Sequence, residues 1–209
     1  MPVIAVEHPL IAHKLTTLRD RRTDSKLFRE IVAELTLLLA YEATRDLPTR
    51  ARHIETPVTG TQGTALANKD FVIAPILRAG LGMLPGLHTL LPSARVAHLG
   101  LRRDEVTKKP ATYYFNYPDH LRNATVFVLD PMLATAGSLC AGIDLLKANE
   151  PERIIAICLI ASPEGARRVE ETHPEVKVFT SAMDERLNEH AFIVPGLGDA
   201  GDRLFGTSA

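Results

Sequence analysis

The stretch that decides the fold lies past the middle of the chain and reads Val126-Phe127-Val128-Leu129-Asp130-Pro131-Met132-Leu133-Ala134-Thr135-Ala136-Gly137-Ser138. The four apolar residues at its start predict a strand that is buried on both faces. A loop of small residues follows, and residues 138–149 have the pattern of a helix. A buried strand that leads through a short loop into a helix is the repeating unit of parallel α/β sheets.

The remainder of the chain repeats this alternation. Further strands are expected at 71–77, 95–101, 154–160 and 176–180, and further helices after Asp24 and at 81–91 and 164–172. Near-continuous apolar strands between amphipathic helices imply an α/β fold, with a parallel central sheet and helices on both faces. We expect one domain over residues 1–209, with a two-stranded β-arm at about 102–123 and a small C-terminal hood at about 184–209.

The composition restricts the choice of partners. The 24 basic and 25 acidic side chains nearly cancel, so the net charge favours neither nucleic acid nor a membrane surface as partner. Cys140 and Cys158 lie in apolar runs and are interpreted as core residues. There is no basic leader and no apolar run of the roughly 18 residues that a membrane span requires, so a cytoplasmic location is expected.

The loop after Leu129 has the properties of a phosphate site. The small residues Ala134, Ala136 and Gly137 let its backbone approach a ligand closely. Thr135 and Ser138 add hydroxyl donors. The free amides at the start of the next helix attract an anion. Asp130, at the end of the strand, can accept hydrogen bonds from sugar hydroxyls. Together these groups indicate a phosphorylated sugar, and the alternative is an ordinary Asp-Pro turn before a capped helix.

Residues 130–138 resemble the signature of the type I phosphoribosyltransferases that binds 5-phosphoribosyl 1-diphosphate (PRPP). The run Asp-Pro-Met-Leu-Ala-Thr followed by Gly-Ser is similar to the form found in uracil phosphoribosyltransferases. The resemblance implies transfer of the phosphoribosyl group from PRPP to uracil, a pyrimidine salvage reaction that gives UMP and diphosphate. It also implies PRPP contacts along the whole loop: Asp130, Pro131, Met132, Leu133, Ala134, Thr135, Ala136, Gly137 and Ser138.

One position departs from the family pattern, which usually has two glycines after the threonine. This chain has Ala136 and then Gly137. If position 136 requires a positive φ, an alanine there costs on the order of 1 kcal/mol. We interpret the substitution as tolerated.

A second loop carries an arginine at the end of a predicted strand, in Ala74-Pro75-Ile76-Leu77-Arg78-Ala79-Gly80-Leu81-Gly82-Met83. A planar guanidinium group can bind two oxygens of a diphosphate at once. The loop resembles the pyrophosphate loop of the uracil enzymes, which implies that Arg78 contacts PRPP. The same resemblance implies that Arg103 is another diphosphate ligand that moves with the arm. Asp130, Arg78 and Arg103 are therefore the candidate catalytic residues.

The tail Phe192-Ile193-Val194-Pro195-Gly196-Leu197-Gly198-Asp199-Ala200-Gly201-Asp202-Arg203 offers bare backbone groups to a flat base. It resembles the uracil-binding hood of the family, which implies base contacts by Ile193, Gly198, Asp199 and Ala200. Asp199 is also a candidate partner of PRPP or of water on Mg²⁺, and Phe192 replaces a tyrosine common in the family. A plain turn is the alternative for this segment.

The resemblance implies several further properties. Mg²⁺ is expected as the cofactor and is carried by PRPP, so no direct metal ligand is expected in the protein. The family also implies a homodimer or a higher homo-oligomer and, in some members, activation by GTP. Neither the effector site nor the number of subunits follows from the sequence.

Two rival functions have partial support in the sequence. Residues 80–86 approximate the dinucleotide fingerprint of a nicotinamide-cofactor enzyme, but Pro85 interrupts the early helix and the third glycine is one residue too far. Residues 196–201 match the fingerprint literally, yet only eight residues follow them. An RNA-binding regulator requires a basic face, and the strongest cluster, Arg19-Asp20-Arg21-Arg22, is interrupted by an acid.

Overall fold

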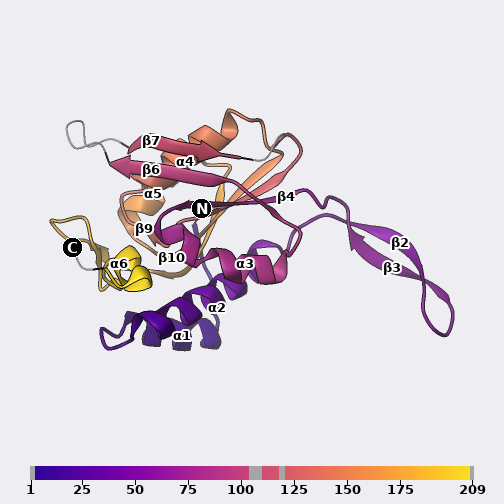
Figure 1. The fold of residues 1–209 in the computed structure, drawn as a ribbon, viewed down its shortest axis with the longest axis horizontal. Helices are drawn as coiled ribbons and strands as arrows, with labels where there is room; N and C mark the ends of the chain where they lie inside the picture. Colours follow the sequence, from indigo (N-terminus) through magenta and orange to yellow (C-terminus); the bar gives the residue numbers. More distant parts are fainter. Residues whose placement is uncertain (1–2, 104–109, 118–120, 208–209) are drawn as a thin grey trace.

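A computed structural model describes residues 3–103, 110–117 and 121–207, with the backbone alone at 102, 103 and 110. Its centre is a nine-stranded sheet in the order β1-β11-β10-β8-β4-β6-β7, with β5 beside β4 and β9 beside β10 (Figure 1). The strands are β1 Val3–Ala5, β4 Phe71–Leu77, β5 Arg95–Val96, β6 His98–Arg103, β7 Pro110–Asn116, β8 Thr125–Leu129, β9 Met132–Leu133, β10 Arg153–Ala161 and β11 Lys177–Met183. All pairings in this sheet are parallel except that of β6 with β7.

Helices cover both faces of the sheet (Figure 1). One face carries α1 Pro9–Arg19, α2 Ser25–Ala43 and α3 Leu84–Leu90, and the other carries α4 Gly137–Lys147 and α5 Pro163–Thr172. Within β8, Phe127 and Leu129 join the core on the α2 side, whereas Val126 and Val128 join the core on the α4 side. Successive side chains of a strand point to opposite faces, so a strand covered on both faces is apolar throughout. The expected fold class is confirmed.

The predicted helices form, with one subdivision. Asp24 caps α2 by accepting the N–H of Leu27 at 2.8 Å, as the sequence indicates. The single helix expected at 81–91 is divided into a short 3-10 turn, η1 Ala79–Gly82, and α3. Pro85 lies in the first turn of α3, where its missing N–H costs nothing.

The β-arm expected at about 102–123 is described only in part. Residues 101–103 of β6 pair antiparallel with residues 110–112 of β7. β6 pairs with β4 through Leu99 and Gly100, which precede the expected arm, so the arm itself stays a prediction. Residues 104–109 and 118–120 of the expected arm lie outside the described residues.

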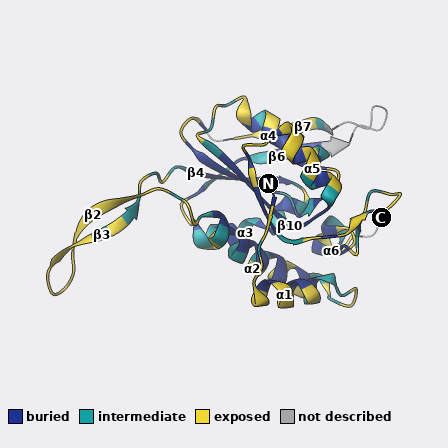
Figure 2. Ribbon diagram, turned by 180° about the vertical axis from the view of Figure 1, so that it is seen from behind, coloured by how far each residue is buried: buried dark blue, intermediate teal, exposed yellow. Residues whose placement is uncertain are grey.

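A hairpin that the sequence analysis did not single out projects from the body. It consists of β2 Thr49–Glu55 and β3 Gly60–Leu66, paired antiparallel (Figures 1 and 2). Every residue of β2 is exposed, and Val58 at the tip is 91% exposed. Because neither face of the hairpin packs on the sheet, its sequence has no alternation of buried and exposed residues that could have revealed it.

Two expectations from composition concern the interior and the membrane. Cys140 and Cys158 are free and buried, which confirms them as core residues. Burial raises the pKa of the Cys158 thiol well above its ordinary value. Within the described ranges, no helix combines the length and apolar character that crossing a membrane would require.

Candidate active site

The candidate site lies where the order of the sheet reverses. β4 and β8 are parallel neighbours, and the chain continues from β4 to β6 on one side and from β8 to β10 on the other. Ligands of open α/β sheets bind at the carboxyl ends of the strands beside such a switch point. The loops after β4 and β8 approach so closely that a Cβ atom on Gly80 would lie 2.5 Å from the carbonyl oxygen of Leu129. Only glycine fits there.

A cavity of about 300 Å³ opens at this point, and three segments far apart in the sequence contribute to its wall. The lining residues are Ala79 after β4, Asp130, Pro131, Met132 and Ala134 after β8, and His190, Ala191, Phe192, Gly198, Asp199, Ala200 and Gly201 near the C-terminus. The three loops singled out from the sequence therefore meet at one cavity.

Other candidate residues lie beside the cavity or behind its wall. The side chains of Leu133 and Ile193 are buried in the core, so only their backbone groups can face a ligand. Arg78, Thr135 and Ser138 are exposed, Gly137 is half-buried, and Ala136 is buried. The side chain of Arg103 lies outside the described residues.

Ala136 occupies the left-handed conformation, with φ of 59°, immediately before α4. This conformation costs an alanine about 1–2 kcal/mol. The buried methyl group, worth about 0.8 kcal/mol, offsets part of this cost. The remaining strain is small enough for the surrounding packed structure to maintain an alanine in this conformation.

The loop presents a row of free backbone donors. In the described part of the chain, the N–H groups of residues 135–139 make no hydrogen bond to a protein acceptor. They lie at the start of α4, where the helix dipole adds partial positive charge. The hydroxyl groups of Thr135 and Ser138 lie in the same segment. This arrangement suits a phosphate monoester.

Asp130 is the carboxylate of the cavity wall. Desolvation by the surrounding protein raises its pKa to about 7, and the neighbouring N–H of Met132 offsets only part of that effect. The folded protein therefore holds a carboxyl group that titrates near neutral pH. Such a group can accept hydrogen bonds from sugar hydroxyls once it is ionised.

Arg78 supplies a cation at the opposite side of the switch point. It follows β4 directly, its peptide bond with Leu77 is cis, and the next residue, Ala79, lines the cavity. Its side chain is exposed and has no hydrogen bond or ion pair to another described residue. The guanidinium group is thus available to an anionic ligand.

The C-terminal part of the cavity is shaped by a turn that the sequence analysis did not identify. β12 Arg186–Leu187 and β13 Ile193–Val194 pair antiparallel, and α6 Ala200–Phe205 follows. Asn188 Oδ1 accepts the N–H groups of His190 and Phe192 at 3.0 and 2.9 Å. The asparagine itself was the available signal, because its side chain favours turns of this kind. We call residues 184–207 the hood.

Two arginines fix the hood to the body of the protein. Arg19 donates to the carbonyl oxygen of Gly196 at 2.6 Å and forms an ion pair with Asp184, whose carboxylate also accepts the Gly196 N–H at 3.0 Å. Arg203 donates to the carbonyl oxygens of Leu18 and Leu197. Partners separated by more than 160 residues leave no local pattern in the sequence, so these contacts were not predicted.

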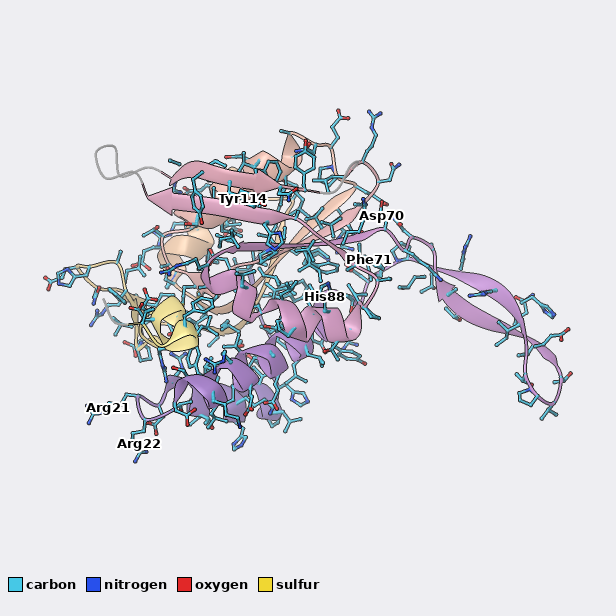
Figure 3. All side chains as sticks on the ribbon, viewed as in Figure 1. Arg21, Arg22, Asp70, Phe71, His88 and Tyr114 are labelled. Atoms are coloured by element: carbon cyan, nitrogen blue, oxygen red, sulfur yellow. The ribbon has the colours of Figure 1, made fainter. Side chains whose placement is uncertain are left out.

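The basic cluster at residues 19–22 does not act as one cationic surface. Arg19 is directed inward to Asp184, and Arg22 pairs with Asp20 at 2.7 Å. Arg21 and Arg22 extend outward from the turn after α1 (Figure 3). The charge of the cluster is therefore divided between anchoring the hood and a local surface pair.

Replacing Asp184 with alanine is expected to lower the free energy of unfolding by about 2–4 kcal/mol, because it leaves Arg19 and the Gly196 N–H without their buried acceptor. Urea unfolding measures this loss. Glu185→Ala is the matched control, since Glu185 is exposed beside it. Equal midpoints for the two variants would show that Asp184 does not anchor the hood.

The comparison with known families agrees with the geometry. A family model described as uracil phosphoribosyltransferase matches residues 5–207. The chain belongs to the uracil phosphoribosyltransferase family. A family member from Symbiobacterium thermophilum is 53% identical over 98% of both chains. Another, from Streptococcus pneumoniae, is 52% identical over 97% of both chains.

Solved structures extend the comparison to the fold. A protein of Aquifex aeolicus is 38% identical and covers 99% of both chains with a TM-score of 0.93. A purine phosphoribosyltransferase from Pyrococcus horikoshii is 17% identical and covers 76% of this chain and 89% of its own, with a TM-score of 0.50. The second likeness shows that the uracil phosphoribosyltransferase family shares its fold with other phosphoribosyltransferases.

Proposed function

We propose that this protein transfers the 5-phosphoribosyl group of PRPP to uracil, giving UMP and diphosphate. The observation that carries the proposal is the single cavity whose wall joins the loops after β4 and β8 to the hood. Membership of the uracil phosphoribosyltransferase family supports the same reaction. The proposal treats residues 1–209 as one domain, with the hood as its base-binding part.

The phosphate of PRPP is assigned to the loop after β8. The free amides of residues 135–139 and the hydroxyl groups of Thr135 and Ser138 supply donors without a full positive charge. The ribose then lies over Asp130, whose carboxylate accepts hydrogen bonds from the sugar hydroxyls. This places C1 of the ribose toward Ala79 and the hood.

The diphosphate is assigned to Arg78, whose planar group can bind two of its oxygens. Arg103 is proposed as a second ligand from the end of β6. Asp199 in the cavity wall can accept a hydrogen bond from water on Mg²⁺, which usually keeps several waters and is carried by the substrate phosphates. When bound, Mg²⁺ supplies positive charge to the departing diphosphate. One oxygen of Asp199 also caps α6 by accepting the N–H of Asp202 at 2.9 Å.

Uracil is assigned to the hood side of the cavity. Gly198 and Ala200 line the wall, and with the backbone of Ile193 they offer main-chain donors and acceptors to the carbonyl and N–H groups of the base. Phe192 also lines the cavity and presents a ring without a hydroxyl group. Cytosine would set an amino donor against a donor of the protein, so its exclusion follows from unsatisfied hydrogen bonding.

The chemistry then depends mainly on position. The bond from C1 to the diphosphate breaks, N1 of uracil forms the new bond to C1 and releases its proton to solvent, and the ribose passes through a state with oxocarbenium character. Arg78 stabilises the charge that develops on the leaving group, and ionised Asp130 stabilises the positive sugar. Because the pKa of Asp130 is about 7 in the free protein, its charge is only partly formed at neutral pH before the ligands bind.

A PRPP-dependent assay with uracil, cytosine, hypoxanthine and orotate in parallel tests this function. We expect UMP from uracil, and a rate with cytosine lower by a factor of about 10–100, equivalent to about 1–3 kcal/mol. Equal use of hypoxanthine or orotate, or no turnover of uracil, would contradict the proposal. Adding GTP to the same assay tests the effector expected from the family.

We also propose a homo-oligomer in which the β2–β3 hairpin packs on a second copy. A two-stranded hairpin alone is marginally stable in water, and this one leaves Ile54 and Val58 40% and 91% exposed. Replacing residues 50–65 with Asn-Gly should keep the fold and weaken assembly, because the strand ends at Thr49 and Leu66 are already paired. Sedimentation of the unaltered protein and of the shortened variant tests this. An equal mass for the two assemblies would exclude the hairpin from the interface.

A further inference from the structure

The helix α5 packs against the outer side of the phosphate loop. Three successive carbonyl groups of the loop are hydrogen-bonded by two residues of this region. The carbonyl oxygen of Leu133 accepts the N–H of Ser162 at 2.9 Å, and that of Ala134 accepts the Ser162 hydroxyl at 2.6 Å. The carbonyl oxygen of Thr135 accepts Nη1 of Arg168 at 3.2 Å.

The part of the contact made by Ser162 is close and buried. Ser162 is fully buried and also caps α5 by accepting the N–H of Gly165 at 3.0 Å. A Cβ atom on Gly165 would lie 2.4 Å from the carbonyl oxygen of Ala134, so no larger residue fits. The next carbonyl, that of Ala136, accepts the N–H of Cys140 at 2.9 Å. Four successive carbonyl groups, 133–136, are therefore bound within the protein.

The direction of these carbonyl groups determines what the loop offers to an anion. When the carbonyl oxygen of a peptide points toward α5, the N–H of the same peptide points away from α5. A carbonyl oxygen that pointed toward the phosphate would instead repel the phosphate. The unpartnered N–H groups of residues 135–139 follow the same stretch of chain. Consecutive N–H groups that converge in this way form an anion-binding concavity.

We infer that Ser162 and Arg168 are positioning residues for the 5′-phosphate, because they hold the loop in its anion-binding conformation from behind. The inference rests on the proposed function and adds to it two residues that do not line the cavity. Arg168 also holds the carbonyl group directly before Ala136, the residue in the left-handed conformation. Arg168 brings a positive charge to the side of the loop opposite the anion.

Comparing the ligands of the proposed reaction distinguishes a role in phosphate binding from a general effect on protein stability. PRPP and UMP both carry the 5′-phosphate, whereas uracil does not. Loss of the positioning contacts should therefore raise the KM for PRPP and the Kd for UMP. The KM for uracil at saturating PRPP should remain unchanged.

Arg168→Ala is the first test, with Arg167→Ala as its matched control. Both arginines are exposed on α5, and within the described chain Arg167 makes no hydrogen bond to the phosphate loop. We expect Arg168→Ala to raise the KM for PRPP and the Kd for UMP about 5- to 10-fold, the effect of one exposed hydrogen bond. Arg168→Lys should recover part of the loss, because an ammonium group can still donate to Thr135.

Ser162→Ala is the second test, and thermal unfolding is measured in parallel because the change also removes the cap of α5. A similar loss for PRPP and UMP in the folded variant supports the inference. UMP binding by Arg168→Ala that equals that of Arg167→Ala would overturn it. If the unaltered protein neither binds UMP nor uses PRPP, the proposed function itself fails, so the two failures are distinguishable.

Discussion

Asp130→Asn is expected to lower kcat by about 100-fold or more, because an amide cannot supply the negative charge that stabilises the sugar in the transition state. The side chain keeps its size and can still accept the Met132 N–H. In the unaltered protein, kcat/KM for PRPP should rise with pH through an apparent pKa near 7, as the free carboxyl group ionises. Steady-state rates between about pH 5.5 and 8.5 measure both effects. Near-normal turnover by Asp130→Asn would remove Asp130 from the mechanism.

Asp130→Asn should raise the free energy of unfolding, although it lowers kcat. The pKa of Asp130 is raised from 3.8 to about 7 on folding, so between these values the folded state holds a proton that the unfolded chain has released. The free energy of unfolding therefore falls as pH rises through this window. At about pH 8 the unaltered protein carries an unfavourable, partly desolvated charge that Asp130→Asn lacks, and the variant should be more stable by about 2 kcal/mol.

Thermal unfolding at two pH values tests this expectation. A gain of about 2 kcal/mol corresponds to roughly 4–8 °C in Tm for a protein of this size. The difference between variant and unaltered protein should be present at about pH 8 and nearly absent at about pH 3, below both pKa values, where the carboxyl group is protonated in both states. A variant that is less stable at pH 8 would show that Asp130 is not held in an unfavourable environment.

Arg78→Ala has the second largest expected effect. It should lower kcat/KM for PRPP by about 100- to 1000-fold, because the diphosphate loses its bidentate partner in both the bound state and the transition state. Arg78→Lys should recover only part of this, since an ammonium group lacks the planar fork. The Tm should stay the same, because the side chain of Arg78 is exposed and makes no hydrogen bond to another described residue.

UMP provides the internal control for Arg78. The product carries the ribose, the phosphate and the base but no diphosphate, so Arg78→Ala should bind UMP as the unaltered protein does. Calorimetric titration with UMP measures this directly. Equal losses for PRPP and UMP would mean that Arg78 shapes the cavity and does not bind the diphosphate. Arg21→Ala, which changes an exposed arginine outside the cavity wall, controls for net charge.

The sequence was most informative where a local rule has a single structural outcome. The apolar run at 126–129 predicted a strand buried on both faces, and β8 contributes to the core on each side of the sheet. The small residues after it predicted a loop and then a helix, and Ala136 marked a left-handed backbone position within that loop. These features depend on neighbours in the chain, so the pattern was sufficient.

The sequence was uninformative in two cases. One is where the structure depends on contacts between residues far apart in the chain, and the other is where a segment makes no contact with the core. Arg19 and Asp184 anchor the hood across 165 positions, and no local pattern indicates that pairing. Ser162 was hidden in the same way, because its role follows from the packing of α5 on the phosphate loop. The β2–β3 hairpin was missed for the opposite reason, since a hairpin without a buried face has no hydrophobic period.

The most direct test of the account is a crystal structure of the protein with UMP. We predict density for the phosphate at the N–H groups of residues 135–139, for the ribose hydroxyls at Asp130, and for the uracil ring against Gly198 and Ala200. A phosphate bound elsewhere, or a base that lies away from the hood, would contradict the account.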